Sequence, residues 1–221
     1  MAITDWATFR RSAAVAALVA HLFGVVAVIL MLVWVFHFRG GVDLNSDNEQ
    51  HIFNVHPFLV HIGFTIVAGE AIMAYKIIPL KHPLQKLAHM AITLIAFVMG
   101  IVGIYAVFKY HHDIHVLQMY SLHSWTGMGT ICLFGFQWLF GFLTFMYPRA
   151  SGQTRAWIIR WHASSGLIIF LLAICNIQSG LSEQLLFLGL MRDKQARVMN
   201  FTGLMTILYG IAVALTVLLP Q

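Results

Sequence analysis

Six stretches of mainly apolar residues follow one another along this chain of 221 residues, and they constrain its fold more than any other feature. The hydrocarbon core of a bilayer is about 30 Å thick, so about 20 residues of α-helix are needed to cross it. We therefore predict an all-α fold, a bundle of six transmembrane helices. The predicted helices cover roughly 12–36, 54–75, 88–108, 120–147, 157–181 and 198–220.

The composition supports a membrane protein built as one unit. Hydrophobic residues make up 60% of the chain and charged residues 10%, which excludes an ordinary water-soluble globule. The connections are short and no repeat or linker divides them, so we expect a single domain over residues 1–221. The first apolar run, about 25 residues long, exceeds the core of a cleaved signal peptide and is expected to remain as a helix. Cys132 and Cys175 lack metal-ligand spacing, so we expect neither a disulfide framework nor a zinc site, and we expect both to fill core positions.

The basic residues indicate a topology. The thirteen Lys and Arg lie in short loops rather than in one basic patch, which argues against a nucleic-acid partner and for a lipid bilayer. If the N-terminus is cytosolic, eight of them fall on the cytosolic side, namely Arg10, Arg11, Lys76, Lys81, Lys86, Arg149, Arg155 and Arg160. The other five are Arg39, Lys109, Arg192, Lys194 and Arg197. Cytosolic loops carry the excess of Lys and Arg, so we predict that both termini of this multi-pass protein are cytosolic.

Four of the twelve histidines occupy equivalent places in the predicted bundle. His56, His89, His123 and His162 each lie within about two turns of the N-terminal end of the second, third, fourth and fifth apolar segment. Consecutive helices run antiparallel, so His56 can meet His123 near the outer face and His89 can meet His162 near the cytosolic face. The two pairs are then separated by roughly 15–20 Å along the membrane normal.

Two facing imidazoles are typical of the axial ligands of a haem iron. A large flat macrocycle fits between the apolar helices of a bundle, and a centre with both axial positions filled carries electrons rather than activating oxygen. Zinc would require further ligands at each site, which no neighbouring Cys or Asp supplies. The alternative interpretation is that the four histidines form hydrogen bonds between helices.

Several short stretches then give the chain a resemblance to a known family. These are "FNVHP" (53–57), "GEA" (69–71), "AYK" (74–76), "KLAH" (86–89), "GIVGIYAVFKYH" (100–111), "YSLHSW" (120–125), "FQWLFGF" (136–142) and "RWH" (160–162). With the steps of 33, 34 and 39 between the four histidines, the chain resembles the cytochrome b561 family and its plant-type transmembrane ascorbate-dependent ferrireductases.

The resemblance implies a four-helix core of the second to fifth helices around two haem b groups. It implies that His56 and His123 hold the outer haem and His89 and His162 the cytosolic haem. Ascorbate would donate electrons in the cytosol, and monodehydroascorbate or a ferric chelate would accept them on the opposite face. The family also suggests a vacuolar, endomembrane or plasma membrane location and a homodimer. The alternatives are a haem subunit fed by quinol in a larger complex, and a non-redox transporter or scaffold.

An ascorbate site is expected at the cytosolic end, because ascorbate is an anion at neutral pH and requires cations near the haem. Lys86 precedes His89 by three residues and Arg155 precedes His162 by seven, and both match family positions. Their charges could alternatively serve only the membrane topology. His82 stands where relatives often have a second lysine.

The remaining candidate residues are interpreted from their positions. His111 precedes His123 by 12 residues and matches a family histidine at the acceptor site, where Lys109 could help to receive an anion. Lys76 and Tyr120 could contact haem propionates. His61, well inside the second helix, is expected to form a structural hydrogen bond, and Glu70 could pair with a basic neighbour that the sequence does not identify.

Overall fold

The computed structural model describes residues 3–219, with side chains from residue 12 onward, and this part of the chain is helical apart from short connections. The topology residues Arg10 and Arg11, and residue 220 of the last predicted helix, lie outside the described side chains. Two of the long helices contain a π-helical stretch with wider turns. The elements are α1 (Ile3–Leu32), η1 (Val33–Phe38), α2 (Glu49–Phe58), η2 (Leu59–Ile66), α3 (Val67–Ile77), α4 (His82–Asp113), α5 (Leu122–Phe145), α6 (Gly152–Phe187) and α7 (Lys194–Leu218).

The prediction of six membrane-spanning helices is confirmed. Six helical segments are long and apolar enough to span, and α2, η2 and α3 together form the second of them. Most boundaries needed correction: α4 extends beyond 88–108 and α6 beyond 157–181, because the helices continue past the hydrocarbon core to polar residues that can end them. By contrast, α5 is shorter than 120–147.

Polar residues at the helix starts explain these boundaries. Ser121 forms a capping box with Ser124 and so starts α5 at Leu122, while Asp193 accepts a hydrogen bond from the backbone N–H of Ala196 at 2.6 Å and starts α7. Pro83 lies in the first turn of α4, where a missing N–H leaves no hydrogen bond unmade. Each cap satisfies backbone groups that the apolar pattern alone cannot locate.

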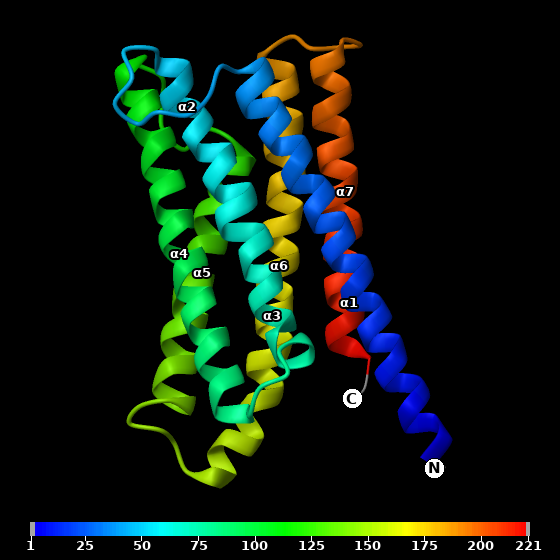
Figure 1. Cartoon of the computed structure of the whole chain (residues 1–221). Helices are drawn as coiled ribbons and strands as arrows, with labels where there is room; N and C mark the ends of the chain where they lie inside the picture. The colour runs from blue at the N-terminus through cyan, green and yellow to red at the C-terminus, as the bar shows by residue number, and fades with distance from the viewer. Residues whose placement is uncertain (1–2, 220–221) are drawn as a thin grey trace.

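Four of the spans share a core (Figure 1). Buried apolar side chains from η2, α3, α4, α5 and α6 pack together, namely Phe64, Ala68, Ala96, Ile131 and Ala173. A second cluster joins α1, η2, α3, α6 and α7 through residues that include Ala20, Met73, Phe170 and Tyr209. Helices α1 and α7 therefore pack beside the group formed by the second to fifth spans.

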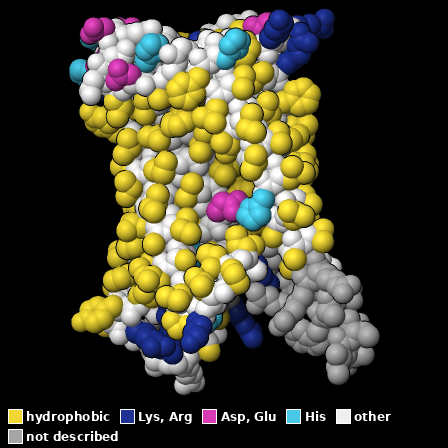
Figure 2. Space-filling model, in the orientation of Figure 1, with side chains coloured by type: hydrophobic (Ala, Val, Ile, Leu, Met, Phe, Trp, Pro, Cys, Tyr) yellow, Lys and Arg dark blue, Asp and Glu magenta, His cyan; other side chains and the backbone are white. Residues whose placement is uncertain are grey.

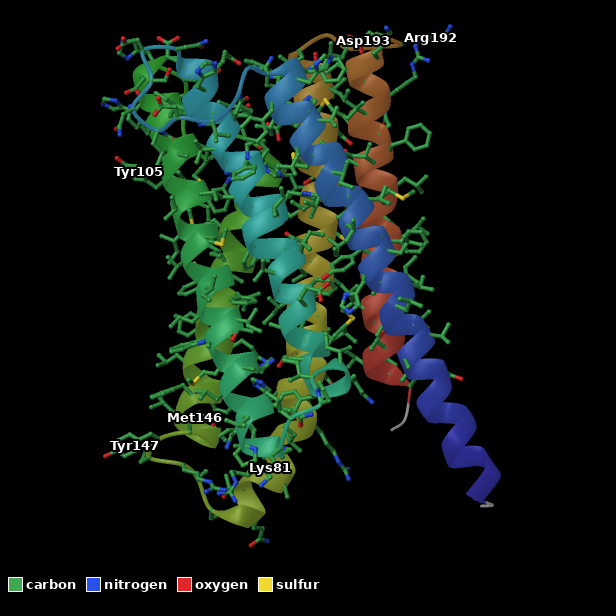
Figure 3. All side chains as sticks on the ribbon, viewed as in Figure 1. Lys81, Tyr105, Met146, Tyr147, Arg192 and Asp193 are labelled. Carbon is green, nitrogen blue, oxygen red and sulfur yellow. The ribbon has the colours of Figure 1, made fainter. Side chains whose placement is uncertain are left out.

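An apolar belt covers the face of the bundle seen in Figure 2, as expected for an integral, multi-pass membrane protein. Charged side chains gather at its two ends, where Lys81 lies at the lower end and Arg192 and Asp193 at the upper end in Figure 3. We call the end at which the described chain starts and finishes the lower end, as in Figure 1. Cys132 and Cys175 are free and exposed rather than in the core, which corrects the expectation for them. Small side chains are tolerated on a lipid-facing surface.

Candidate functional site

The structure brings the four histidines together in two pairs, one towards each end of the bundle. At the upper end the ring centres of His56 on α2 and His123 on α5 lie 6.2 Å apart, with the ring planes at 85°. At the lower end the ring centres of His89 on α4 and His162 on α6 lie 6.3 Å apart, at 76°. These are the pairs that antiparallel connection predicts from the sequence.

Three of the four rings are oriented by backbone carbonyl groups. His56 Nδ1 lies 3.0 Å from the oxygen of Gly103, and His89 Nδ1 lies 2.8 Å from that of Ala71. His123 Nδ1 lies 3.1 Å from the oxygen of Asn176. A carbonyl oxygen only accepts, so Nδ1 carries the proton in each ring and Nε2 has a free lone pair. This is the arrangement that metal-binding histidines commonly have.

The fourth ring has a different partner. The side-chain amide of Gln137 on α5 donates to His162 Nδ1 at 3.2 Å and to the His162 carbonyl at 2.6 Å, while Ser165 donates to Gln137 Oε1 at 3.1 Å. A proton on His162 Nδ1, which would leave Nε2 free, requires Gln137 to turn its amide oxygen towards the ring. Gln137 is a polar residue in a mainly apolar segment, and its contact with the His162 ring was not predicted.

Glycines on facing helices leave room for two of the rings. A Cβ atom at Gly180 on α6 would lie 2.6 Å from His123 Cε1 on α5, and a Cβ atom at Gly141 on α5 would lie 2.8 Å from His162 Cε1 on α6. Real Cβ atoms do not approach other atoms so closely. The two helices therefore each place a histidine against a glycine of the other.

Both pairs fit one metal ion between two imidazoles. A metal–imidazole bond is about 2.0–2.1 Å and the ring centre lies roughly 1.1 Å beyond the nitrogen, so two rings on one ion have centres about 6 Å apart. Among the described side chains, no group of three or more His, Cys, Asp or Glu could hold a metal. The remaining ligands would therefore come from a cofactor, and a porphyrin with two axial imidazoles fits this donor set.

The upper pair lines a cavity that also contains candidate acceptor residues. His111 and Tyr120 line it, with ring centres 6.0 Å apart, and His111 Nδ1 lies 3.2 Å from Gln118 Oε1. Glu183 also lines it and accepts a hydrogen bond from the Ser121 hydroxyl at 3.1 Å. Lys109 instead pairs with Asp113 at 2.8 Å, so its charge is already compensated.

The lower end has a group of cations. Lys86 Nζ donates to the carbonyl of Phe145 at 2.5 Å, and Arg149 and Arg155 lie close enough to act on Lys86 electrostatically. The sequence predicted Lys86 and Arg155 but not Arg149, which lies in the connection between α5 and α6, where no helical register indicates its direction. The loop nevertheless brings all three positive charges to one end.

Lys76 and Tyr75 are adjacent in the chain and have different contacts. Lys76 donates from Nζ to the Leu219 carbonyl at 3.0 Å, towards the end of α7, and its contact with a haem stays a prediction. Tyr75, which the sequence did not single out, has its ring centre 5.4 Å from that of His89 and 5.8 Å from that of His82. Tyr75 therefore contacts both His82, which stands where relatives often have a second lysine, and His89 of the lower pair.

The structural interpretation of His61 is confirmed. This ring is fully buried and its Nε2 lies 2.8 Å from the hydroxyl of Thr206 on α7. The π-helical stretch η2 follows Pro57, whose missing N–H interrupts the regular helix and changes the direction of the residues after it. His61 therefore joins η2 to α7 and does not face His56.

Known proteins resemble this chain over most of its length. The family described as eukaryotic cytochrome b561 matches residues 55–188, which include all four paired histidines. The "Probable ascorbate-specific transmembrane electron transporter 1" of Oryza sativa subsp. japonica is 46% identical over 209 residues, covering 91% of this chain and 88% of the relative. The "Transmembrane ascorbate ferrireductase 1" of Arabidopsis thaliana is 44% identical over 211 residues, covering 94% and 88%.

Proposed function

The chain belongs to the cytochrome b561 family, and from this we propose that it is an ascorbate-dependent transmembrane electron transporter and ferrireductase. The observation that carries this proposal is the presence of two histidine pairs, with ring centres 6.2 and 6.3 Å apart, towards opposite ends of one helical core. Two electron carriers in line through a membrane can pass charge without moving a substrate across it.

In this proposal His56 and His123 hold one haem b, and His89 and His162 hold the other. Each haem, when bound, would supply a reversible one-electron change at its iron, with one histidine pair as protein ligands. Carbonyl groups accept the protons on the Nδ1 atoms of three of these histidines, which leaves their Nε2 lone pairs free to bind a haem iron. Apolar side chains, which include Phe64 and Ile131, line the cavity of the upper pair.

We place the donor at the lower end and assign this end to the cytosol. Lys86, Arg149 and Arg155 give it a local positive charge that attracts the ascorbate anion. With cytosolic termini, the positive-inside pattern supports this orientation. An electron that moves outward across a membrane negative inside gains about 2.3 kcal/mol per 100 mV. The direction of transfer then agrees with the electric field.

We place the acceptor at the upper end, beside His111 and Tyr120. Both line the cavity of the upper pair, so monodehydroascorbate or a ferric chelate bound there could approach the haem edge. Tyr120 could also contact a haem propionate. A vacuolar, endomembrane or plasma membrane location and a homodimer remain predictions from the family.

The proposal is tested with purified protein in liposomes. Ascorbate added on the lower side should reduce two haems, seen as sharp visible bands, and should then reduce a ferric chelate present only on the upper side. A colourless protein would favour the non-redox transporter or scaffold. Haems that ascorbate in millimolar amounts fails to reduce would favour a subunit fed by quinol.

Removing one cation should weaken the donor site. In Lys86→Ala we expect the ascorbate concentration for half-maximal haem reduction to rise about 5- to 30-fold, because one charge roughly 8–16 Å from an anion contributes about 1–2 kcal/mol at an effective dielectric constant near 20. The measurement is the initial rate of haem reduction against ascorbate concentration. Lys109→Ala, at the other end, is the matched control, and equal effects of the two changes would contradict the donor assignment.

Replacing His82 with lysine, which relatives often have at this position, should strengthen the donor site. His82 is exposed, and Tyr75 connects it to His89, so a permanent charge there adds to the field that ascorbate meets. We expect His82→Lys to lower the half-maximal ascorbate concentration about 2- to 5-fold at neutral pH. His82→Gln separates charge from side-chain size, and an identical result for Lys and Gln would rule out the electrostatic explanation.

A further inference from the structure

A polar pair lies inside the apolar belt, away from both histidine pairs. His21 Nδ1 on α1 lies 3.1 Å from Glu70 Oε2 on α3. At 1.5 Å per residue, His21 is about 13 Å past Ser12, where its span starts, and Glu70 is about 10 Å before Ile77, where its span ends. Figure 2 shows an acidic side chain beside a histidine within the belt. The basic partner that the sequence left open for Glu70 is therefore His21.

The pair is not enclosed by the protein. The side chains of His21 and Glu70 are 39% and 32% exposed, and at this depth the surroundings are lipid. Polar groups that face hydrocarbon without a partner are costly, so such residues within spans usually serve a function. A carboxylate can accept about four hydrogen bonds, and no described contact uses Nε2 of His21. On the side that faces lipid, the Glu70 carboxylate can therefore accept further hydrogen bonds, and Nε2 of His21 is available for one.

The inner side of the pair is held in place by α7. The hydroxyl of the fully buried Tyr209 donates to the Ile66 carbonyl at 2.8 Å and lies 3.3 Å from Glu70 Oε1. Its ring packs closely against Gly24 of α1, and its hydroxyl lies against Gly69 of α3, where a Cβ atom would collide with it. Helices α1, α3 and α7 meet here, and the two glycines leave room for the tyrosine hydroxyl to lie against the carboxylate on its protein side.

Glu70 is also adjacent in the chain to a residue that contacts the lower histidine pair. The carbonyl of Ala71, the residue after Glu70, accepts the hydrogen bond from His89 Nδ1 at 2.8 Å. One turn of α3 therefore orients a proposed haem ligand on its inner face and presents Glu70 towards lipid. A molecule bound at Glu70 would lie beside the turn that holds His89.

We propose that His21 and Glu70 bind a membrane-soluble quinol from the lipid phase. One ring hydroxyl of the quinol donates to Glu70, whose carboxylate also accepts from Nδ1–H of His21, and the ring lies on Leu18 and Val25. These two exposed apolar residues flank His21 at three and four positions on the same face of α1. A quinol ring can enter the hydrocarbon and bring a hydroxyl group to the depth of this pair, and the test below distinguishes it from a sterol hydroxyl.

Binding is tested on the purified holoprotein in phosphatidylcholine nanodiscs. The probe is a decyl-substituted benzoquinol, and its dimethyl ether, which lacks the hydroxyl protons, is the matched ligand control. We expect the quinol to raise the unfolding temperature in a concentration-dependent way, and the ether to have no such effect. Glu70→Gln loses the charged acceptor of the hydroxyl proton and His21→Leu loses the group that orients this carboxylate, so each should weaken quinol binding about tenfold or more.

Asp47→Asn removes an exposed carboxylate in the loop between η1 and α2 and should leave quinol binding unchanged. Equal binding of quinol and ether, unchanged binding in Glu70→Gln, or binding of cholesterol but not of the quinol would each overturn the proposal. If a variant does not fold, the comparison of quinol with ether on the unaltered protein still decides. Dithionite keeps the proposed haems reduced in every sample, so the result is independent of the proposed electron transport.

Discussion

Replacing His89 with alanine should remove one of two haems and slow ascorbate-driven reduction by on the order of 100-fold or more. Loss of a residue that merely orients a ligand costs about 10- to 100-fold in metal affinity, and loss of the ligand itself should cost at least as much. His162 alone would supply only one of the two proposed protein ligands. The Ala71 carbonyl also loses its donor. The haem content per polypeptide, measured as the pyridine complex, should fall from two to one.

His123→Ala provides the comparison at the upper end. This variant should also contain one haem, but ascorbate should still reduce it, because the donor cations and the lower pair are unchanged. Electrons should then fail to reach a ferric chelate on the upper side. His61→Gln removes a buried histidine that contacts Thr206 and should retain both haems. A His89→Ala protein with two haems, or one reduced by ascorbate at the original rate, would contradict the assignment of this pair.

The spans and the histidine pairs could be predicted from the sequence because both depend on patterns along the chain. Membrane thickness sets the length of an apolar run, and antiparallel connection sets which helix starts lie at the same depth. The same reasoning could not give helix ends, since the apolar runs do not mark the caps: Ser121 lies inside the predicted segment 120–147, and Asp193 lies before the predicted segment 198–220.

The groups that orient the histidines could not be predicted, because they are backbone atoms or residues distant in sequence. Any residue has a carbonyl group, so nothing in the sequence marks Gly103 or Ala71 as the partner of a particular ring.

The contact between His21 and Glu70 could not be predicted either. These residues are 49 positions apart, and their contact depends on the rotation of α1 and α3 about their axes. The apolar pattern defines such rotation poorly when all sides of a helix are apolar.

The reciprocal packing of α5 and α6 leads to the second large expected effect. Gly180→Ala should displace the His123 ring and Gly141→Ala the His162 ring, because each new methyl group would lie within 3 Å of a ring carbon. Overpacking of this kind costs about 1–3 kcal/mol, which corresponds to a roughly 5- to 150-fold loss of haem affinity if the ligand ring takes up the shift. We expect each variant to lose mainly its own haem.

The two glycine variants can be distinguished by their response to ascorbate. Gly180→Ala should retain a lower haem that ascorbate reduces, whereas Gly141→Ala should retain an upper haem that ascorbate reduces slowly. Gly129→Ala is the matched control on α5, because nothing lies within 4 Å of its added Cβ atom, and it should retain both haems. Gly180→Ala and Gly141→Ala could both match Gly129→Ala in haem content and in ascorbate response. This result would show that the rings can move without loss of ligation. The close glycine contacts would then be a consequence of helix packing alone, with no part in holding the cofactors.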